Sequence, residues 1–276
     1  MIDLHTHTTA SDGRLSPEDL VARAASAGVT VLSVTDHDTT AGCAAAARSA
    51  AAAAIEFVPG IEITAVIAEA DVHVLGYFIN PRSPTLEAFL SAQRQLRIDR
   101  VREMVARLGR HGIALDAEAI LAPAVADPSR SAGRPWIARA LVAGGHVADS
   151  NHAFDRWLER GRPAFVPRTG ASPAEVFSRI HEAGGLASLA HPLLVGNDSW
   201  IPEFADSGLD ALEAYHSDHD DAATRKYLAF AARLGLAVTG GSDFHADEFH
   251  GPIEPGSISL PRDKYEDFKA RRQNHL

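Results

Sequence analysis

The chain has 276 residues, of which 46% are hydrophobic and 22% are charged, a balance typical of a globular protein with a sizeable core. Its formal net charge of -10 excludes a broad electrostatic hold on duplex nucleic acid, which needs many phosphate contacts from lysine and arginine. The only cysteine, Cys43, excludes an internal disulfide and a cysteine-based zinc site. The chain opens directly into strand-like residues without a basic, apolar leader, so we expect a cytoplasmic protein.

The first predicted strand carries a pair of histidines that could chelate a metal ion. Side chains alternate along a strand, which places His5 and His7 on the same face. Imidazole suits Zn, Mn, Fe or Cu, and Asp12 on the following turn could add an oxygen ligand. A helix is expected from Ser16 to Ala27, because serine, proline and acidic residues stand at its start.

More candidate ligands lie at later strand-like segments. These segments alternate with helix signals, which favours parallel strands with right-handed crossovers, most economically closed into a barrel. Because the carboxyl ends of parallel strands meet at one rim, we expect a single metal centre there. A strand at 209–214 and a helix at 220–234 complete the alternation. The candidates are His37 after residues 29–35, Glu62 in 57–63, His73 in 71–77, His191 after 185–190, and Asp243 and His245 after 236–242.

Residues 81–165 interrupt the alternation and predict a helical insertion that lies over the rim as a cap. One long amphipathic helix is expected at 85–108, because its apolar residues recur at helical spacing. Shorter helical pieces are expected around 117–121, 135–143 and 152–160. The predicted domains are therefore a barrel, residues 1–80 and 166–276, and a small helical cap domain, residues 81–165. Two of the remaining histidines, His250 and His275, are expected at the surface.

Arginines are concentrated in this insertion. Arg94, Arg97 and Arg100 lie near one face of the long helix, and we expect most such arginines to form a solvated face paired with neighbouring acids. Arg134 differs, because it follows Gly133 at a helix start where backbone N–H groups point outward. A guanidinium at a helix amino terminus is a good phosphate clamp. Candidate substrate-binding residues are thus Gly133, Arg134, Arg97 and Arg100.

The ligand set favours metal-assisted phosphate-ester hydrolysis. The chain has no Gly-x-Ser-x-Gly elbow and no phosphate-binding loop of the Gly-x-x-x-x-Gly-Lys type. Two or more divalent ions close together activate a bridging water and neutralise charge on a phosphoryl group. Glu62 is the best bridging residue because its carboxylate offers two oxygens. Some amidohydrolases use a carboxylated lysine in mid-chain instead, but the three lysines here, Lys226, Lys264 and Lys269, all lie near the carboxyl end.

The expected ligands divide among two or three ions. Manganese is favoured, although histidine and carboxylate ligands also accept iron and zinc. The candidate catalytic residues are Glu62, Asp12 and His216, which follows a strand end and could contact the substrate or protonate the leaving group. Asp36 and Asp38 flank a ligand, and at least one should support it or cap a turn. The hypothetical division is His5, His7 and Asp243 at one ion, His73 and His191 at a second, and Asp12, His37 and His245 at a third.

Seven motifs in order along nearly the whole chain resemble the polymerase and histidinol phosphatase (PHP) family of metal phosphoesterases. The resemblance implies a distorted seven-stranded (β/α) barrel and a centre of two or three ions built from the motif positions. The chain carries Asp12 where trinuclear members of the family carry histidine. The motifs are Asp-Leu-His-Thr-His-Thr at 3–8, Ser-Asp-Gly at 11–13, Val-Thr-Asp-His-Asp at 34–38, Pro-Gly-Ile-Glu at 59–62, Val-His-Val-Leu-Gly at 72–76, Ala-His-Pro at 190–192 and Gly-Ser-Asp-Phe-His at 241–245.

The turn at 133–135 and the insertion also resemble 3′,5′-nucleoside bisphosphate phosphatases, which remove the 3′-phosphate to leave a 5′-nucleotide. In that reading a metal-bridging hydroxide attacks the 3′-phosphate, while Arg134 and either Arg97 or Arg100 hold the other phosphate. The expected partner is a small anionic phosphorylated substrate, with no duplex nucleic acid and no membrane. Alternatives are a phosphatase for another small monoester such as histidinol phosphate, a 5′-to-3′ exonuclease on short RNA, and a non-catalytic metal-binding scaffold.

Overall fold

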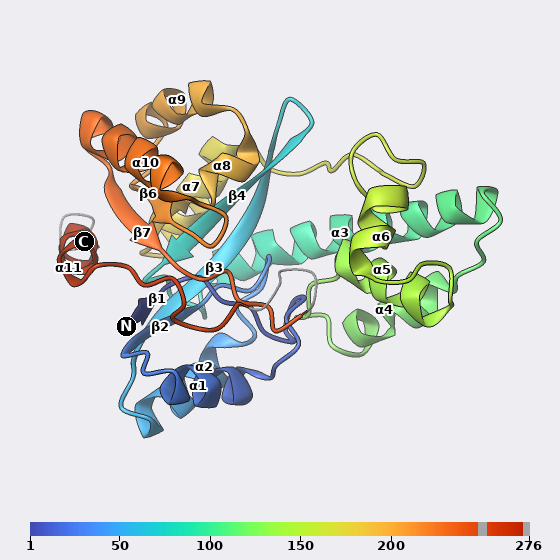
Figure 1. The fold of residues 1–276 in the computed structure, drawn as a ribbon, viewed down its shortest axis with the longest axis horizontal. Coiled ribbons are helices and arrows are strands. Elements are labelled where there is room, and N and C mark those ends of the chain that lie inside the picture. Colours follow the sequence, from blue (N-terminus) through green and yellow to red (C-terminus); the bar gives the residue numbers. More distant parts are fainter. Residues whose placement is uncertain (248–252, 273–276) are drawn as a thin grey trace.

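The structure is a computed structural model that describes residues 1–247 and 253–272 (Figure 1). His250 and His275 lie outside these ranges. Among the residues described, no helix combines the length and the apolar character that a membrane span requires. Where the protein works in the cell stays a prediction.

Seven strands of the described chain form one sheet whose spatial order follows the sequence. The end of β7 and the segment after it run beside the segment after β1, where the Leu4 amide donates to Gly240 at 3.2 Å and the His7 amide donates to Phe244 at 2.9 Å. These contacts bring the two ends of the sheet together. The distorted (β/α)7 barrel expected from the sequence is therefore confirmed. The strands are β1 (Ile2–Asp3), β2 (Val31–Val34), β3 (Glu56–Ile67), β4 (Ala70–Tyr77), β5 (Leu186–Leu189), β6 (Ala211–Tyr215) and β7 (Ala237–Gly240).

The expectation that all strands are parallel is wrong for β4. This strand is antiparallel to both of its neighbours, β3 and β5, whereas the other neighbouring pairs are parallel. Only Ala68 and Glu69 separate β3 from β4, and both have positive φ, 47° and 63°. A two-residue turn of that kind reverses the chain, and it leaves no room for the crossover that parallel strands need.

Helices surround the barrel and have the ends that the sequence predicts. The Ser16 hydroxyl accepts a hydrogen bond from the Asp19 amide at the start of α1, and Gly235 ends α10 with a φ of 68°. Apolar faces of these helices pack on the strands in two clusters of buried side chains. The barrel helices are α1 (Pro17–Ser26), α2 (Cys43–Ala52), α7 (Pro173–Glu182), α8 (Pro192–Val195), the short 3-10 turn η2 (Asp198–Trp200), α9 (Ile201–Asp206), α10 (Asp221–Leu234) and α11 (Arg262–Arg271).

The helical insertion projects to one side of the barrel (Figure 1). Its long helix α3 begins on the barrel, where Leu86 and Leu90 join the barrel core. The second half of α3 packs into a separate core that holds Val101, Met104 and Leu108. This separate core supports the predicted division into two domains, which stays a prediction. The insertion comprises α3 (Pro84–Arg110), α4 (Ala117–Ala126), α5 (Arg134–Ala143), α6 (Ser150–Ala153) and the π-helical turn η1 (Phe154–Leu158).

Candidate metal centre

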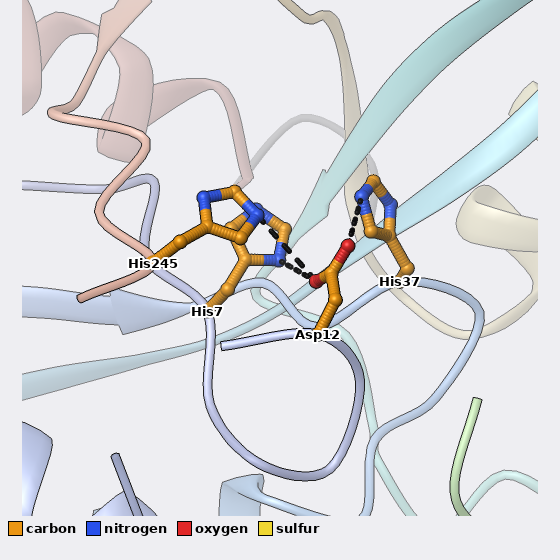
Figure 2. A group of neighbouring side chains, drawn as sticks. All are labelled: His7, Asp12, His37 and His245. Carbon is orange, nitrogen blue, oxygen red and sulfur yellow. Dashed lines mark ion pairs between the residues drawn. The ribbon is translucent and has the colours of Figure 1, made fainter. Parts of the chain in front are cut away.

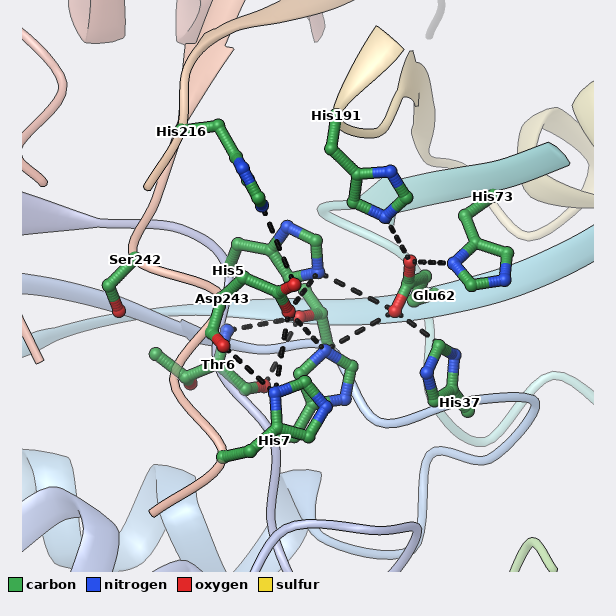
Figure 3. Close-up of polar contacts among 12 residues, drawn as sticks. His5, Thr6, His7, His37, Glu62, His73, His191, His216, Ser242 and Asp243 are labelled. Atoms are coloured by element: carbon green, nitrogen blue, oxygen red, sulfur yellow. Dashed lines mark hydrogen bonds and ion pairs between the residues drawn. The ribbon is translucent and has the colours of Figure 1, made fainter. Parts of the chain in front are cut away.

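The nine residues predicted as metal ligands lie together at one rim of the barrel (Figures 2 and 3). They come from the segments that follow β1, β2, β5 and β7 and from the strands β3 and β4 themselves. His5 and His7 face the cluster, whereas the Thr6 hydroxyl between them donates to the Ser33 carbonyl, as the alternation along an extended chain requires. The nine are His5, His7, Asp12, His37, Glu62, His73, His191, Asp243 and His245.

Glu62 lies at the middle of this cluster and uses both of its carboxylate oxygens (Figure 3). Burial raises the pKa of the Glu62 carboxyl, but neighbouring imidazoles, His37 above all, bring the net pKa well below its usual value. The side chain is therefore a charged carboxylate, as a bridging ligand must be. Its oxygen Oε1 lies 2.7 Å from His73 Nδ1 and 3.2 Å from His191 Nε2, and Oε2 lies 3.0 Å from His37 Nδ1, 3.2 Å from His7 Nε2 and 3.5 Å from His5 Nε2.

Asp12 gathers a second group of donors, shown in Figure 2. Its Oδ1 lies 3.4 Å from His245 Nε2 and 3.7 Å from His7 Nδ1, and its Oδ2 lies 3.6 Å from His37 Nε2. One donor atom from each of these residues lies within 4.8 Å of the others. Burial raises the pKa of the Asp12 carboxyl, but the nearby imidazoles of His37 and His245 lower it by more than burial raises it. The net pKa is therefore well below the usual value. The group offers three imidazoles and one carboxylate to a divalent ion.

Asp243 and His216 extend the cluster on the side of β6. Asp243 Oδ1 lies 3.2 Å from His5 Nε2 and 3.1 Å from His7 Nε2, and its Oδ2 lies 3.5 Å from His216 Nε2. His216 is buried and its Nδ1 accepts the Asp218 amide at 3.1 Å. A neutral imidazole that accepts at Nδ1 carries its proton at Nε2. The geometry therefore gives His216 a proton that it can donate toward the cluster.

The buried donor atoms fit divalent ions. Several lack a hydrogen-bond partner among the residues described, and leaving such an atom unpaired costs about 1–3 kcal/mol. Imidazole nitrogens and carboxylate oxygens are the donors that Mn, Fe and Zn bind in proteins. Divalent ions would satisfy all of these atoms at once. The unpaired atoms include His5 Nε2, both ring nitrogens of His7, His37 Nδ1, Glu62 Oε2, His73 Nδ1 and Asp243 Oδ1.

The division of ligands among ions stays a prediction because the groups share members. His7 faces Asp12 through Nδ1 and faces Glu62 and Asp243 through Nε2. We expected His7 to bind beside His5 only, yet it also belongs to the group around Asp12. His216, expected only as a substrate contact or proton donor, falls in one group with His5 and Asp243.

Glu213 is a supporting residue that the sequence reading missed. It is fully buried in β6, and its two oxygens lie 3.0 and 3.2 Å from His5 Nδ1. Its Oε2 also accepts the His191 amide at 2.8 Å. A carboxylate at Nδ1 fixes a histidine with Nε2 free to bind a metal. The only signal in the sequence is an acid inside an otherwise apolar strand.

The flanking aspartates support the centre, as expected for at least one of them. Asp36 accepts hydrogen bonds from the Thr8 amide at 2.8 Å, the Thr8 hydroxyl at 2.6 Å and the Ser11 hydroxyl at 2.7 Å, which holds the turn that carries Asp12. Asp38 accepts the Thr64 amide at 3.1 Å and forms an ion pair with Arg97.

The expectation of a solvated arginine face on α3 is wrong. Arg94, Arg97 and Arg100 are only 4%, 6% and 8% exposed. Arg97 donates to Asp38, to the Thr64 hydroxyl at 3.0 Å and to the Ala132 carbonyl at 3.3 Å. Arg100 donates to the Val166 carbonyl at 2.8 Å. These arginines lie on the side of α3 that faces the barrel, where the helix runs between the two cores, and the exposed residues of the same stretch, Gln95, Leu96 and Asp99, lie on its solvent side.

A cavity of about 240 Å³ joins the metal-ligand cluster to Arg97 and to further arginines. Besides the ligands it is lined by Arg97, Gly133, Arg134 and Arg168. Arg134 begins α5, and no hydrogen bond from its guanidinium is found among the described residues. A Cβ on Gly133 would lie 3.5 Å from Arg97 Nη1, at ordinary van der Waals distance, so Gly133 lies directly beside that guanidinium. Sequence reading missed Arg168, which sits in the loop before α7 without any helical pattern.

Positive charge exceeds negative charge in this region. Arg97, Arg100, Arg134 and Arg168 crowd around two carboxylates, Asp38 and Asp71. Burial, reinforced by repulsion from neighbouring guanidiniums, lowers the pKa of Arg168 to about 10 and that of Arg100 to about 9. Arg100 Nη2 and Arg168 Nε have no hydrogen-bond partner in the described part of the chain. Buried, partly unpaired guanidiniums favour binding of an anion such as phosphate.

Comparison with known proteins places this site in context. A model of the PHP domain matches residues 3–124. The chain is similar to a 3′,5′-nucleoside bisphosphate phosphatase from Chromobacterium violaceum, at 36% identity over 89% of this chain and 87% of that protein. It is also similar to a 5′-3′ exoribonuclease from Haemophilus influenzae, at 36% identity over 88% of this chain and 89% of that protein. A solved structure from Bifidobacterium adolescentis, assigned as a metal-dependent phosphoesterase, superimposes with a TM-score of 0.88. The two are 30% identical, and the match covers 98% of this chain and 95% of that one.

Proposed function

The chain belongs to the PHP family of metal-dependent phosphoesterases, and from this premise we propose that it removes the 3′-phosphate from 3′,5′-nucleoside bisphosphates. The products are a nucleoside 5′-monophosphate and phosphate. The observation that carries the proposal is the single cavity that contains both the metal-ligand cluster and the arginine cluster. A substrate with two phosphates can occupy both at once.

The arginine cluster is the part of the site that selects a bisphosphate. We assign the non-reacting 5′-phosphate to Arg134 and Arg168. Among the described residues the Arg134 guanidinium makes no hydrogen bond, and Arg168 has ion-pair contacts of 3.5 and 3.7 Å to carboxylates. Arg97 holds the cluster against the barrel through Asp38. Binding the second phosphate would orient the first at the ligand cluster, and such positioning can supply several kcal/mol of the barrier.

The reacting phosphate belongs at the ligand cluster. Two or three divalent ions, Mn²⁺ by preference, would activate a water as nucleophile and neutralise charge on the phosphoryl group. Glu62 would hold two ions together, and Asp12 would hold an ion with His37 and His245. His216 presents Nε2–H to the cluster and is the proposed proton donor to the departing 3′-oxygen.

The insertion, residues 81–165, acts in this proposal as a cap that supplies substrate contacts. The start of its α5 brings Gly133 and Arg134 to the cavity, and the exposed Leu194 of α8, on the barrel, lines it too. Phe154 and Leu194 also line this cavity and would give the nucleoside an apolar surface. A histidinol phosphatase would have no need for the arginine cluster, since its substrate carries one phosphate.

Phosphate release from four phosphate monoesters tests the proposal. Protein loaded with Mn²⁺ is assayed with adenosine 3′,5′-bisphosphate, 3′-AMP, 5′-AMP and histidinol phosphate. We expect the bisphosphate to have the highest kcat/KM, and Arg134→Gln to remove most of its advantage over 3′-AMP. Arg156→Gln, an exposed arginine of the same insertion, is the matched control. A bisphosphate hydrolysed no faster than the monophosphates overturns the proposal.

A further inference from the structure

We propose that the arginine cluster beside the metal centre encloses a site for one small monovalent anion such as chloride. The site is a cavity of about 10 Å³ lined by Arg97, Arg100, Arg134 and Arg168. A single water molecule needs about 10–15 Å³, so this small cavity has no room for a phosphate group. Chloride is slightly larger than water, and the ends of the long arginine side chains can move to admit it. The site itself is independent of the proposed function, but its effect on bisphosphate binding rests on that function.

The small cavity lies between two larger ones. An outer cavity of about 210 Å³ lies between α3 and residues 166–169, and exposed residues of α3 line it, so it opens to solvent. An ion can therefore reach the guanidiniums without passing the metal centre. The small cavity shares Gly133 and Arg134 with the metal cavity, Arg100 with the outer cavity, and Arg97 and Arg168 with both.

Two of these guanidiniums have buried N–H donors without a partner. Within the described part of the chain, Arg100 Nη2 and Arg168 Nε make no hydrogen bond. The other donors of Arg100 are used at Nε, 2.8 Å from the Val166 carbonyl, and at Nη1, 3.9 Å from Asp71. A charged donor that is buried without a partner is costly. An anion held between Arg100 and Arg168 would satisfy both.

The balance of charge also favours an anion in the small cavity. The four guanidiniums face two carboxylates, Asp38 and Asp71, which leaves an excess of two positive charges. Burial, together with repulsion from Arg168 and Arg134, lowers the pKa of Arg100 to about 9. A water molecule in the cavity would leave this repulsion unbalanced, whereas a chloride ion would reduce it.

The surroundings favour a monovalent ion over a dianion. Apart from the arginines, the side chains that line the small cavity are apolar. Two acids, Asp99 and Glu103, line the outer cavity, where they pair with Arg102 at 3.5 Å and with Arg107 at 3.0 Å. Repulsion grows with the charge of the incoming anion, so these acids oppose a phosphate dianion more than they oppose chloride.

Chloride in this site would compete with the 5′-phosphate of the substrate. Arg134 and Arg168 line both the small cavity and the metal cavity, so the two anions share donors. A phosphate monoester carries a charge of about -2, which alone balances the excess of two positive charges. Bound chloride therefore weakens binding of the bisphosphate. It leaves 3′-AMP unaffected, because that substrate has no 5′-phosphate.

Anomalous diffraction from bromide tests the site directly. Bromide is a monovalent halide like chloride, and its anomalous scattering at the bromine absorption edge identifies it. Crystals of the Mn²⁺-loaded wild type grown in sodium bromide should show a peak in the small cavity, beside Arg100 and Arg168. The site is overturned if no peak lies at these arginines, or if the peak lies only in the metal cavity.

Thermal unfolding measures chloride binding in solution. Chloride replaces gluconate at constant ionic strength, which separates binding at a site from general screening. Once chloride exceeds its dissociation constant about fivefold, the melting temperature of the wild type should be about 2–4 °C higher than in gluconate. Arg100→Gln should lose this difference, whereas Arg156→Gln, at an exposed position of the insertion, should keep it. Equal responses in wild type and Arg100→Gln overturn the site, and the bromide peak decides where Arg100→Gln does not fold.

Kinetics test the competition and separate it from the proposed function. At the same chloride concentration, the KM for adenosine 3′,5′-bisphosphate should rise by up to about sixfold, and the KM for 3′-AMP should not change. If bromide binds and both KM values stay unchanged, the site stands and the competition is overturned. If the bisphosphate is hydrolysed no faster than the monophosphates, the proposed function fails, while the bromide peak and the melting temperatures still decide the site.

Discussion

Replacing Glu213 with glutamine tests whether a buried carboxylate holds a metal ligand in place. The Glu213 oxygens contact both His5 Nδ1 and the His191 amide. A glutamine can offer its oxygen to only one of these groups. If its NH2 group then donates to His5 Nδ1, the imidazole proton moves to Nε2, the nitrogen that faces Glu62. A protonated Nε2 cannot bind an ion.

The expected loss can be sized from this geometry. Removing a carboxylate that supports a ligating histidine typically costs about 10–100-fold in metal affinity. That range corresponds to about 1.4–2.8 kcal/mol. Glu213 is fully buried, so no water replaces the lost charge, and it supports two ligands instead of one. We therefore expect a loss of about 100-fold in metal affinity.

Metal affinity and activity are measured together. Wild type and Glu213→Gln are equilibrated in a series of buffered free Mn²⁺ concentrations, and bound manganese is counted by atomic emission while phosphate release is followed. The activity of the variant should recover at high Mn²⁺, because the substrate contacts are intact. Glu203→Gln, an exposed acid on α9, controls for the loss of one negative charge.

Unchanged manganese affinity in Glu213→Gln would refute the assigned role. A variant with a lower melting temperature in the metal-free form but normal affinity would show that Glu213 only stabilises the barrel. Activity that stays low at saturating Mn²⁺ would place its effect on the reaction instead of on metal binding.

Other parts of the site give separate expectations. Glu62→Gln should lose bound metal and activity together, as should thorough chelation of the wild type, with metal content read by atomic emission. His216→Asn should lower kcat by about 100-fold or more on the bisphosphate while keeping its metal. It should retain more activity on p-nitrophenyl phosphate, whose leaving group needs no proton. Arg168→Gln should raise KM for the bisphosphate and leave that for 3′-AMP unchanged, since only the first carries a 5′-phosphate.

The ligand cluster could be predicted because most of its residues lie at the ends of strands. Functional residues inside a strand or in a loop could not be predicted in this way. His37 and His191 lie within three residues of the ends of β2 and β5, so barrel topology alone places them at one rim. Glu213 lies inside a strand and in none of the motifs, so only the contact with His5 reveals it. Arg168 stands in a loop without periodicity, and its burial depends on how the insertion folds back on the barrel.

Local signals also failed where long-range packing decided the outcome. The turn at Ala68 and Glu69 contains neither glycine nor asparagine, the residues that usually mark a hairpin with positive φ. The sequence therefore did not indicate that β4 is antiparallel to its neighbours. The arginines of α3 have acidic neighbours at helical spacing, which favoured exposure, but their positions between two cores bury them.

Two arginines in the same cavity should respond differently to the same substitution. Arg97 and Asp38 form a buried ion pair, at 6% and 1% exposure, and removing one member of such a pair typically destabilises by about 3–5 kcal/mol. Arg134 has no ion pair in the described structure, so Arg134→Gln should change stability by only about 0.5 kcal/mol. Thermal unfolding of the metal-free variants measures this difference. Since Asp38 adjoins the ligand His37, Arg97→Gln should also weaken metal binding, whereas Arg134→Gln should weaken only binding of the bisphosphate. Equal melting temperatures for the two variants would mean that Arg97 does not join the insertion to the metal centre.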